Sequence, residues 1–177
     1  QGGQSSMVLA YMFPDRIKKL VWGAGHIGTG GGYAAENLIT VRPEASGLVS
    51  RDASENPTSE NIRRYLSVHI RDQELITDEL VEYILKSYTG RPDLAEARAK
   101  SRGASHDHSH EMVNIKAPTL MVWGRYDRTC NFEIGINSLN HISNSRLVIL
   151  HCGHWVPFEK PEEYTAHVLN FLKADWA

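Results

Sequence analysis

The sequence predicts an α/β fold in which helices flank a parallel sheet and a helical segment is inserted between strands. Three short apolar runs, at 17–22, 119–123 and 146–150, have the length of buried strands. Helical patterns separate these runs, and alternating strands and helices favour a parallel sheet that is covered on both faces. From about 33 to 112 the chain is highly charged and helical periodicity dominates, which indicates the insertion.

The first predicted segment, residues 1–32, contains a core helix and a strand. We expect the helix over 6–13, because the residue before Pro14 is kept out of the α region. The strand over 17–22 runs into a glycine cluster at 23–32, which is typical of a loop at a strand end.

The second predicted segment, residues 33–112, is a mostly helical lid. One helix is expected to start at Ser59, and another after Thr77, a good N-cap residue followed by two acids. A third amphipathic stretch covers 93–100.

The third predicted segment, residues 113–177, returns to the sheet. It places a helix over 132–142 between its two strands and starts a closing helix at Pro161, where a proline and two acids suit the first turn. An apolar stripe on the closing helix comprises Tyr164, Val168, Leu169 and Leu172.

Composition excludes several classes of partner. Lys plus Arg is 19 and Asp plus Glu is 21, so the balanced charge argues against nucleic acid or an anionic membrane. No run approaches the roughly 18 apolar residues of a membrane span. The two cysteines, Cys130 and Cys152, are too few for a disulfide scaffold, so we expect a cytoplasmic protein.

The strongest chemical signal is an acid and a histidine after neighbouring strands. Asp127 follows the run at 119–123, and His154 follows the run at 146–150. The carboxyl ends of parallel strands meet at one edge of a sheet, where sites form. A carboxylate there can fix the tautomer of a histidine and meet its developing charge, as in a Ser-His-Asp relay. Either residue alone fits a structural role, with Asp127 as a helix cap.

The same residues carry a family resemblance. Residues 115–177 resemble the C-terminal part of an α/β-hydrolase. Within that superfamily, Gly124-Arg125-Tyr126-Asp127-Arg128 and Cys152-Gly153-His154-Trp155 resemble the meta-cleavage-product hydrolases, which cleave carbon–carbon bonds in vinylogous 1,5-diketones from aromatic-ring degradation. The resemblance covers the whole chain, weakly over 33–112, and residues 11–17 resemble the end of the helix that follows the nucleophile.

That register places the nucleophile outside the sequence. In the family, a Pro-Asp-Arg helix end lies about fourteen residues after the catalytic serine of Gly-x-Ser-x-Gly. Counting back from Pro14 puts this serine immediately before Gln1, whose backbone N–H then forms half of the oxyanion hole. We therefore expect a preceding N-terminal part, in the same chain, as a cleaved fragment or as a separate chain. Ser5 is the alternative nucleophile, or an ordinary residue of the first helical turn.

The resemblance implies further roles and one departure. Trp155 is expected to line the substrate cleft, or simply to pack as an aromatic residue, and Cys130 to face the same pocket, or to be a small buried hydrophobe. The family's lid arginine, which holds the substrate carboxylate, is replaced in register by Ile84, with Arg91 and Arg98 nearby. This departure puts the dienoate substrate in question more than the hydrolase.

Two other motifs suggest different functions. Residues 23–28 match the dinucleotide fingerprint, with Glu44 about twenty residues on, but the pattern needs a helix over 26–36 that the following glycines would break. His106, His108 and His110 have metal-ligand spacing, yet lie in a Gly/Ser-rich linker and lack a fourth ligand.

We therefore predict a hydrolase of a carbon–carbon bond in a meta-ring-fission product. It needs no cofactor or metal, acts on a small aromatic-derived substrate and forms a homo-oligomer. A carboxylesterase or lactonase with the same triad is the enzyme alternative, and a hydrolase-fold receptor for small molecules is the non-enzyme alternative.

Overall fold

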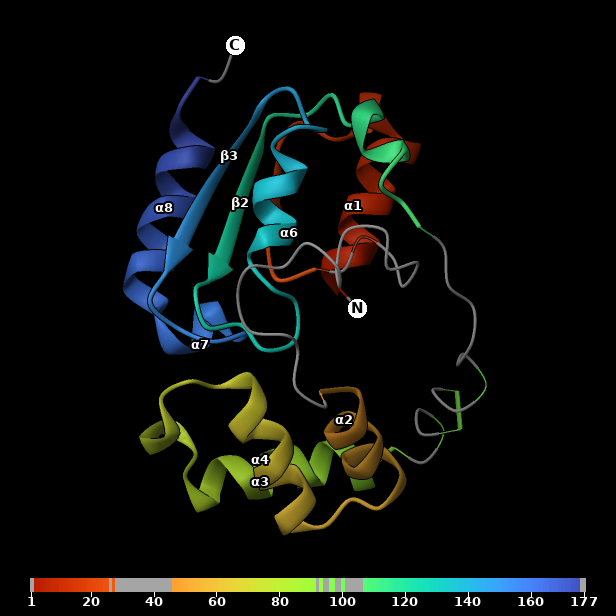
Figure 1. The fold of residues 1–177 in the computed structure, drawn as a ribbon, viewed down its shortest axis with the longest axis vertical. Coiled ribbons are helices and arrows are strands. Elements are labelled where there is room, and N and C mark those ends of the chain that lie inside the picture. The colour runs from red at the N-terminus through yellow and green to blue at the C-terminus, as the bar shows by residue number, and fades with distance from the viewer. Residues whose placement is uncertain are drawn as a thin grey trace.

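A three-stranded parallel sheet forms the centre of the part of the protein that the structure describes. The computed structural model describes residues 2–25, 27, 46–91, 93, 96–97, 100 and 107–175. Within these residues the strand order is β1 (Leu20–Trp22), β2 (Thr119–Gly124) and β3 (Ser145–Leu150), with all strands parallel (Figure 1). The predicted parallel sheet is confirmed, and its first strand is shorter than expected.

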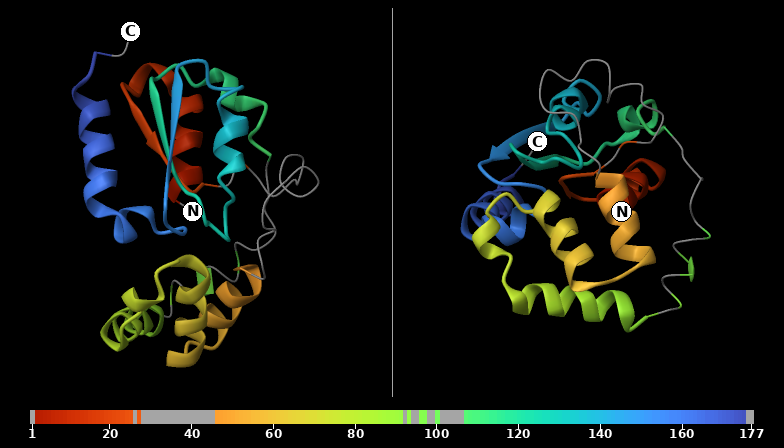
Figure 2. Two further views of the ribbon diagram at one scale, coloured as in Figure 1. Left: turned by 60° about the vertical axis from the view of Figure 1, so that its left-hand side comes forward. Right: turned by 60° about the horizontal axis from the view of Figure 1, so that its bottom comes forward.

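Helices cover both faces of the sheet. Successive residues of β2 point to opposite faces. Trp123 packs with α1 (Gly2–Met12) and α6 (Glu133–Ser138), whereas Val122 packs on the other face with α8 (Pro161–Lys173). Figure 2 shows the sheet between these layers. Because both faces are covered, β2 is buried along its whole length.

Three helices form a separate layer beyond the carboxyl ends of the strands. These are α2 (Ser46–Glu55), α3 (Ser59–His69) and α4 (Asp78–Thr89), drawn at the bottom of Figure 1. Buried Ile62 and Leu66 of α3 belong to their shared apolar cluster. The layer lies within the predicted lid, whose boundaries at 33 and 112 remain predictions.

Capping residues explain where the lid helices begin. The Thr58 hydroxyl accepts a hydrogen bond from the Asn61 N–H, and the Thr77 hydroxyl accepts one from the Leu80 N–H, both at 3.2 Å. These bonds satisfy amide groups that have no partner inside the helix. The predicted helix starts at Ser59 and after Thr77 are confirmed.

Several elements differ from the prediction. Helix α1 begins at Gly2 instead of residue 6, and α6 covers about half of the predicted 132–142. Short helical turns complete the described chain: η1 (Pro14–Arg16), η2 (Gln73–Leu75), η3 (Glu111–Asn114) and α7 (Val156–Glu159). Half of the predicted stretch at 93–100 lies outside the described residues, and the described half (93, 96–97 and 100) is helical.

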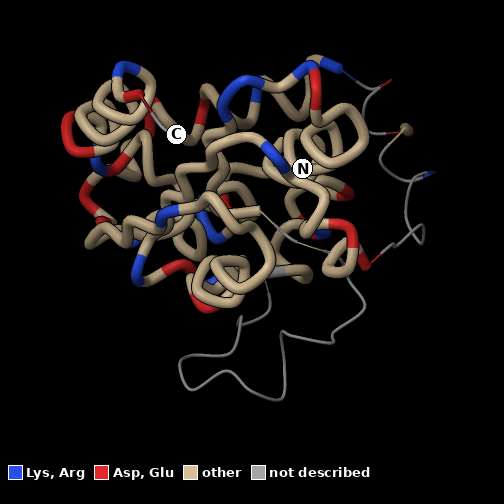
Figure 3. Tube along the Cα trace, turned by 90° about the horizontal axis from the view of Figure 1, so that it is seen from above, with Lys and Arg blue, Asp and Glu red and all other residues tan. Residues whose placement is uncertain are grey.

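Charge is distributed without a dominant sign over the described trace. Acidic and basic residues alternate around it, as Figure 3 shows. Among the described helices, none is long and apolar enough to cross a membrane.

The buried face of α8 differs from the predicted stripe. Phe171 is 1% exposed and packs with Tyr164 and Val168, but Leu169 and Leu172 are nearly half exposed, at 45% and 49%. The stripe is therefore rotated, because the sheet selects the side of the helix that carries the aromatic residues. Leu169 and Leu172 belong to the predicted apolar stripe but not to the buried face of the helix.

Replacing Phe171 with alanine should destabilise the full-length protein by about 3–5 kcal/mol, because a buried aromatic side chain leaves a cavity. Leu172→Ala is the matched control on the same helix and should cost less than about 1 kcal/mol. Urea unfolding of both variants measures the difference. Equal losses would contradict the observed orientation of α8.

Candidate active site

The site begins where β2 and β3 end side by side. The loop after β2 carries Asp127, and the loop after β3 carries His154. Two backbone bonds join these loops: the Tyr126 N–H donates to the Cys152 carbonyl at 2.9 Å, and the Arg125 N–H donates to the Leu150 carbonyl at 2.8 Å. The parallel sheet therefore delivers the acid and the histidine to one place.

Asp127 and His154 form a hydrogen-bonded pair. His154 Nδ1 lies 2.8 Å from Asp127 Oδ2, and the Asp127 side chain is completely buried. The other carboxylate oxygen, Oδ1, accepts the N–H groups of Thr129 and Cys130, both at 2.8 Å. A neutral imidazole that donates through Nδ1 keeps Nε2 free to accept a proton. The pair has the arrangement of an acid that orients a base.

His154 opens onto a cavity of about 590 Å³. The start of α1 lines one part of this cavity with Gly2, Gly3 and Ser6, and Trp155 lines another. The Ser6 hydroxyl donates to the Gly3 carbonyl at 2.9 Å. The backbone at the beginning of α1 thus shares a space with the histidine.

The structure separates the two serines of α1. Ser6 lines the cavity beside His154, whereas Ser5 is exposed and is not among the lining residues. The sequence pointed to Ser5 and not to the adjacent Ser6, because Ser5 stands two residues after Gly3, as the Gly-x-Ser motif requires. Gln1, the expected oxyanion donor, lies outside the described residues.

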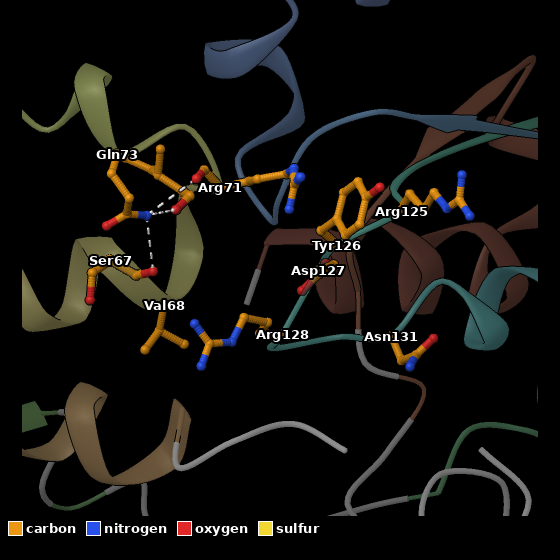
Figure 4. Close-up of a pocket in the computed structure, with 10 residues that line it drawn as sticks. Ser67, Val68, Arg71, Gln73, Arg125, Tyr126, Asp127, Arg128 and Asn131 are labelled. Atoms are coloured by element: carbon orange, nitrogen blue, oxygen red, sulfur yellow. Dashed lines mark hydrogen bonds between the residues drawn. The ribbon is translucent and has the colours of Figure 1, made fainter. Parts of the chain in front are cut away.

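A second cavity, of about 300 Å³, lies between α3 and the Asp127 loop (Figure 4). Ser67 and Val68 line its lid side, and Arg128 lines its core side. The Arg71 guanidinium lies 3.6 Å from the centre of the Tyr126 ring, within the range of a cation–π contact. The lid therefore contacts the core next to the buried acid.

His69, the last residue of α3, is a site residue that sequence reasoning missed. Its carbonyl accepts the His154 N–H at 2.7 Å, and its ring centre is 5.3 Å from that of His154. Its Nδ1 donates to the Tyr65 carbonyl at 2.7 Å. Burial lowers the pKa of His69 to about 4, so the ring is neutral near pH 7. No local pattern marks a contact between residues so far apart in the chain.

The remaining predicted residues occupy different environments. Trp155 lines the His154 cavity and its ring stacks edge-to-face with Tyr65. Cys130 is 3% exposed within the sheet core, where its carbonyl accepts the Trp123 indole N–H at 2.7 Å. It is not among the residues that line the two cavities described above, and its expected place beside the substrate stays a prediction. Burial raises the pKa of the Cys130 thiol, which disfavours a thiolate.

The lid position expected to carry an arginine is apolar. Ile84 packs against the buried cluster of the lid helices. Arg91 is exposed and forms a fork with the Asp93 carboxylate, at 2.9 and 2.7 Å. Arg98 lies outside the described residues.

The other motifs gain no support as sites. The helix required for nucleotide binding over 26–36 and the acid Glu44 lie outside the described residues, as does His106. Over the residues that are described, no group of three His, Cys, Asp or Glu side chains could hold a metal ion.

Known proteins of similar sequence are hydrolases. The chain is 34% identical over 177 residues to a 2-hydroxy-6-oxononadienedioate/2-hydroxy-6-oxononatrienedioate hydrolase from Burkholderia vietnamiensis. This match covers 97% of the chain and 59% of the relative, so the chain spans little more than half the length of that protein. No protein-family model matches the chain.

Solved structures share the fold. A 2-hydroxy-6-oxo-6-phenylhexa-2,4-dienoate hydrolase from Rhodococcus sp. strain RHA1 superposes with a TM-score of 0.75 at 20% identity, over 98% of this chain and 62% of that one. An enol-lactonase from Burkholderia xenovorans LB400 gives 0.71 at 19% identity, over 98% and 63%. At these identities the likeness shows the fold alone.

His69 should make stability depend on pH. Its folded pKa of about 4 lies below the unfolded value near 6.5, so the unfolded chain takes up the proton first as the pH falls. The stabilisation is complete above about pH 6.5 and is lost progressively toward pH 4. Between pH 7 and 5 we expect His69 to account for a loss of about 2 kcal/mol.

Urea unfolding of full-length wild type and His69→Gln at both pH values measures this contribution. The variant should lose about 2 kcal/mol less than wild type between pH 7 and 5. Exposed His167→Gln is the control and should follow wild type. Identical pH dependence in His69→Gln and wild type would refute the assignment.

Proposed function

We propose that this chain, as a member of the meta-cleavage-product hydrolases of the α/β-hydrolase superfamily, supplies the acid and the base of a carbon–carbon bond hydrolase. The substrate is a vinylogous 1,5-diketone formed by ring fission. The observation that carries the proposal is the 2.8 Å bond between His154 and fully buried Asp127. The name of the Burkholderia relative, a hydrolase of hydroxy-oxo-dienedioates, supports this substrate class.

In this proposal His154 moves the protons and Asp127 holds it in place. His154 Nε2 takes the proton of the serine nucleophile and returns protons to the substrate during ketonisation and cleavage. Water is consumed: its oxygen goes to the acyl carbon, which becomes a carboxylic acid, and a proton goes to the carbon that leaves. The buried Asp127 carboxylate stabilises the imidazolium that forms on the way.

The nucleophile in this proposal is a serine immediately before Gln1, supplied by a preceding part of the protein. Two observations support it. The start of α1, at Gly2 and Gly3, lines the cavity into which His154 opens. The N-terminal N–H groups of a helix also favour an oxyanion, the role assigned here to the Gln1 N–H. Trp155 lines another part of the same cavity, and in this proposal it contacts the substrate.

An ester or lactone hydrolase is the second candidate. Ile84 and the Arg91–Asp93 fork provide no cation at the lid position that holds a substrate carboxylate in the family. A substrate without that carboxylate avoids the loss of such a charge-assisted contact.

The proposal also includes location and assembly: the protein is cytoplasmic and forms a homo-oligomer. Both cysteines of the chain are free thiols.

Replacing Asp127 with asparagine in the full-length protein should lower kcat by about 10⁴-fold, because the histidine loses its tautomer and its counter-charge. Absorbance of a 2-hydroxy-6-oxo-dienedioate follows turnover. Asp15→Asn, an exposed acid that pairs with Lys116 at 3.6 Å, is the control and should leave kcat unchanged. Turnover of esters or lactones, but of no dienedioate, would favour the second candidate. Absence of turnover of dienedioates, esters and lactones alike would contradict the proposal that the protein is an enzyme.

A serine-reactive fluorophosphonate should modify the full-length protein at the residue preceding Gln1. Peptide mass spectrometry locates the label, and Ser5→Ala and Ser6→Ala should both retain it. His154→Ala should label much more slowly, since the base no longer activates the hydroxyl. A label on Ser5 or Ser6, abolished by the matching alanine variant, would overturn the proposed register.

A further inference from the structure

We infer that Glu159 is a positioning residue that ties the lid to the His154 loop through three backbone hydrogen bonds. Glu159 is the last residue of α7. Its Oε1 accepts the Gly153 N–H at 2.8 Å, on the core side. Its Oε2 accepts the N–H groups of Arg71 and Asp72, at 2.9 and 3.1 Å, on the lid side. One carboxylate thus binds two segments that lie more than eighty residues apart in sequence.

A fourth bond extends the tie to the histidine itself. The His154 N–H donates to the carbonyl of His69, two residues before Arg71, at 2.7 Å. The histidine loop is therefore bound to one lid segment directly at His154 and through the Glu159 carboxylate at Gly153. Because the Asp127 bond fixes only the ring of His154, these backbone bonds determine where the rest of the residue lies.

At Gly153 the lid segment and the histidine loop pack too closely to admit a side chain between them. A Cβ on Gly153 would lie 2.6 Å from the His69 carbonyl oxygen and 2.9 Å from both the Arg71 nitrogen and Glu159 Oε1. The lid segment and the histidine loop therefore meet backbone to backbone. Loss of the carboxylate leaves the part-buried Gly153 N–H without its acceptor, whereas the exposed Arg71 and Asp72 N–H groups turn to water and no longer hold the lid segment.

The chemistry of the tie requires a carboxylate. Its two oxygens serve three N–H donors, and bonds to an ionised acceptor are the stronger kind. The amide of glutamine has the same shape but one acceptor oxygen, and its NH₂ group would face an N–H. Glu159→Gln therefore loosens the tie while leaving Asp127 and His154 unchanged.

The inference rests on the proposed function for its kinetic readout. In the full-length protein, Glu159→Gln should lower kcat about tenfold or more, with KM changed less than threefold, because the base is held less well while the cavity remains. Backbone amide exchange in peptides covering 70–73 and 151–155 should accelerate at least tenfold, which is more than any fall in the urea midpoint accounts for. Glu162→Gln, an exposed acid on α8, is the matched control and should change none of these.

A second variant tests the lid side of the tie without touching α7. Asp72 has a φ of −77°, which proline can adopt, so Asp72→Pro removes one donor. Asp72→Ala keeps the N–H and controls for the lost side chain. Asp72→Pro should accelerate exchange in 151–155 and lower kcat beyond the effect of Asp72→Ala.

Unchanged exchange at 151–155 in both Glu159→Gln and Asp72→Pro would overturn the inference. It would also be overturned if the fall in the urea midpoint accounted fully for the faster exchange and the lower kcat. If wild type fails to turn over a dienedioate, the proposed function fails. The exchange measurements still decide the tie in that case, because they need no substrate.

Discussion

The ends of β2 and β3 can come together because Gly124 and Gly153 carry no side chains. A Cβ on Gly124 would overlap the carbonyl oxygen of Gly153, so any other residue would force the two loops apart. The bond between Asp127 and His154 depends on this approach, since the two residues lie on the separate loops. The lid depends on it as well, because Gly153 is also its contact point. A steric constraint on the backbone thus comes before the polar chemistry of the site.

The polar groups around His154 are arranged so that little can move. Asp127 accepts two backbone N–H groups through one carboxylate oxygen and the imidazole through the other. A carboxylate fixed in this way needs no reorganisation when the imidazole becomes charged, and that is the main advantage of a preorganised site. Neutral His69 beside it adds no competing positive charge.

Local patterns predicted the strands, the start of the lid helices and the loops that carry Asp127 and His154. Each of these depends on residues close in sequence: apolar runs, N-cap threonines and acids in the first turn. The family resemblance predicted the hydrolase fold. The start of α1 was placed too late because glycines favour loops, whereas packing against the sheet overrides that preference.

Contacts between distant segments could not be predicted. The roles of His69 and Glu159 arise where the lid meets the core, and neither residue stands in a pattern that announces it. Cys130 is a second case in which a local pattern did not predict the environment of a side chain. Its spacing from Asp127 suggested a pocket residue, but its backbone, through the N–H to Asp127 and the carbonyl to Trp123, serves the site while its side chain fills the core.

The burial of both thiols has a practical consequence for labelling the lid at a chosen position. The chain has two cysteines, and they are 3% and 1% exposed. Burial raises the pKa of both thiols, that of Cys152 to about 12, so maleimides and similar reagents meet no accessible thiolate on this chain near neutral pH. A cysteine introduced on the exposed side of α4 would therefore accept a fluorescent or spin label selectively. The label then reports on the lid while both cysteines of this chain are kept.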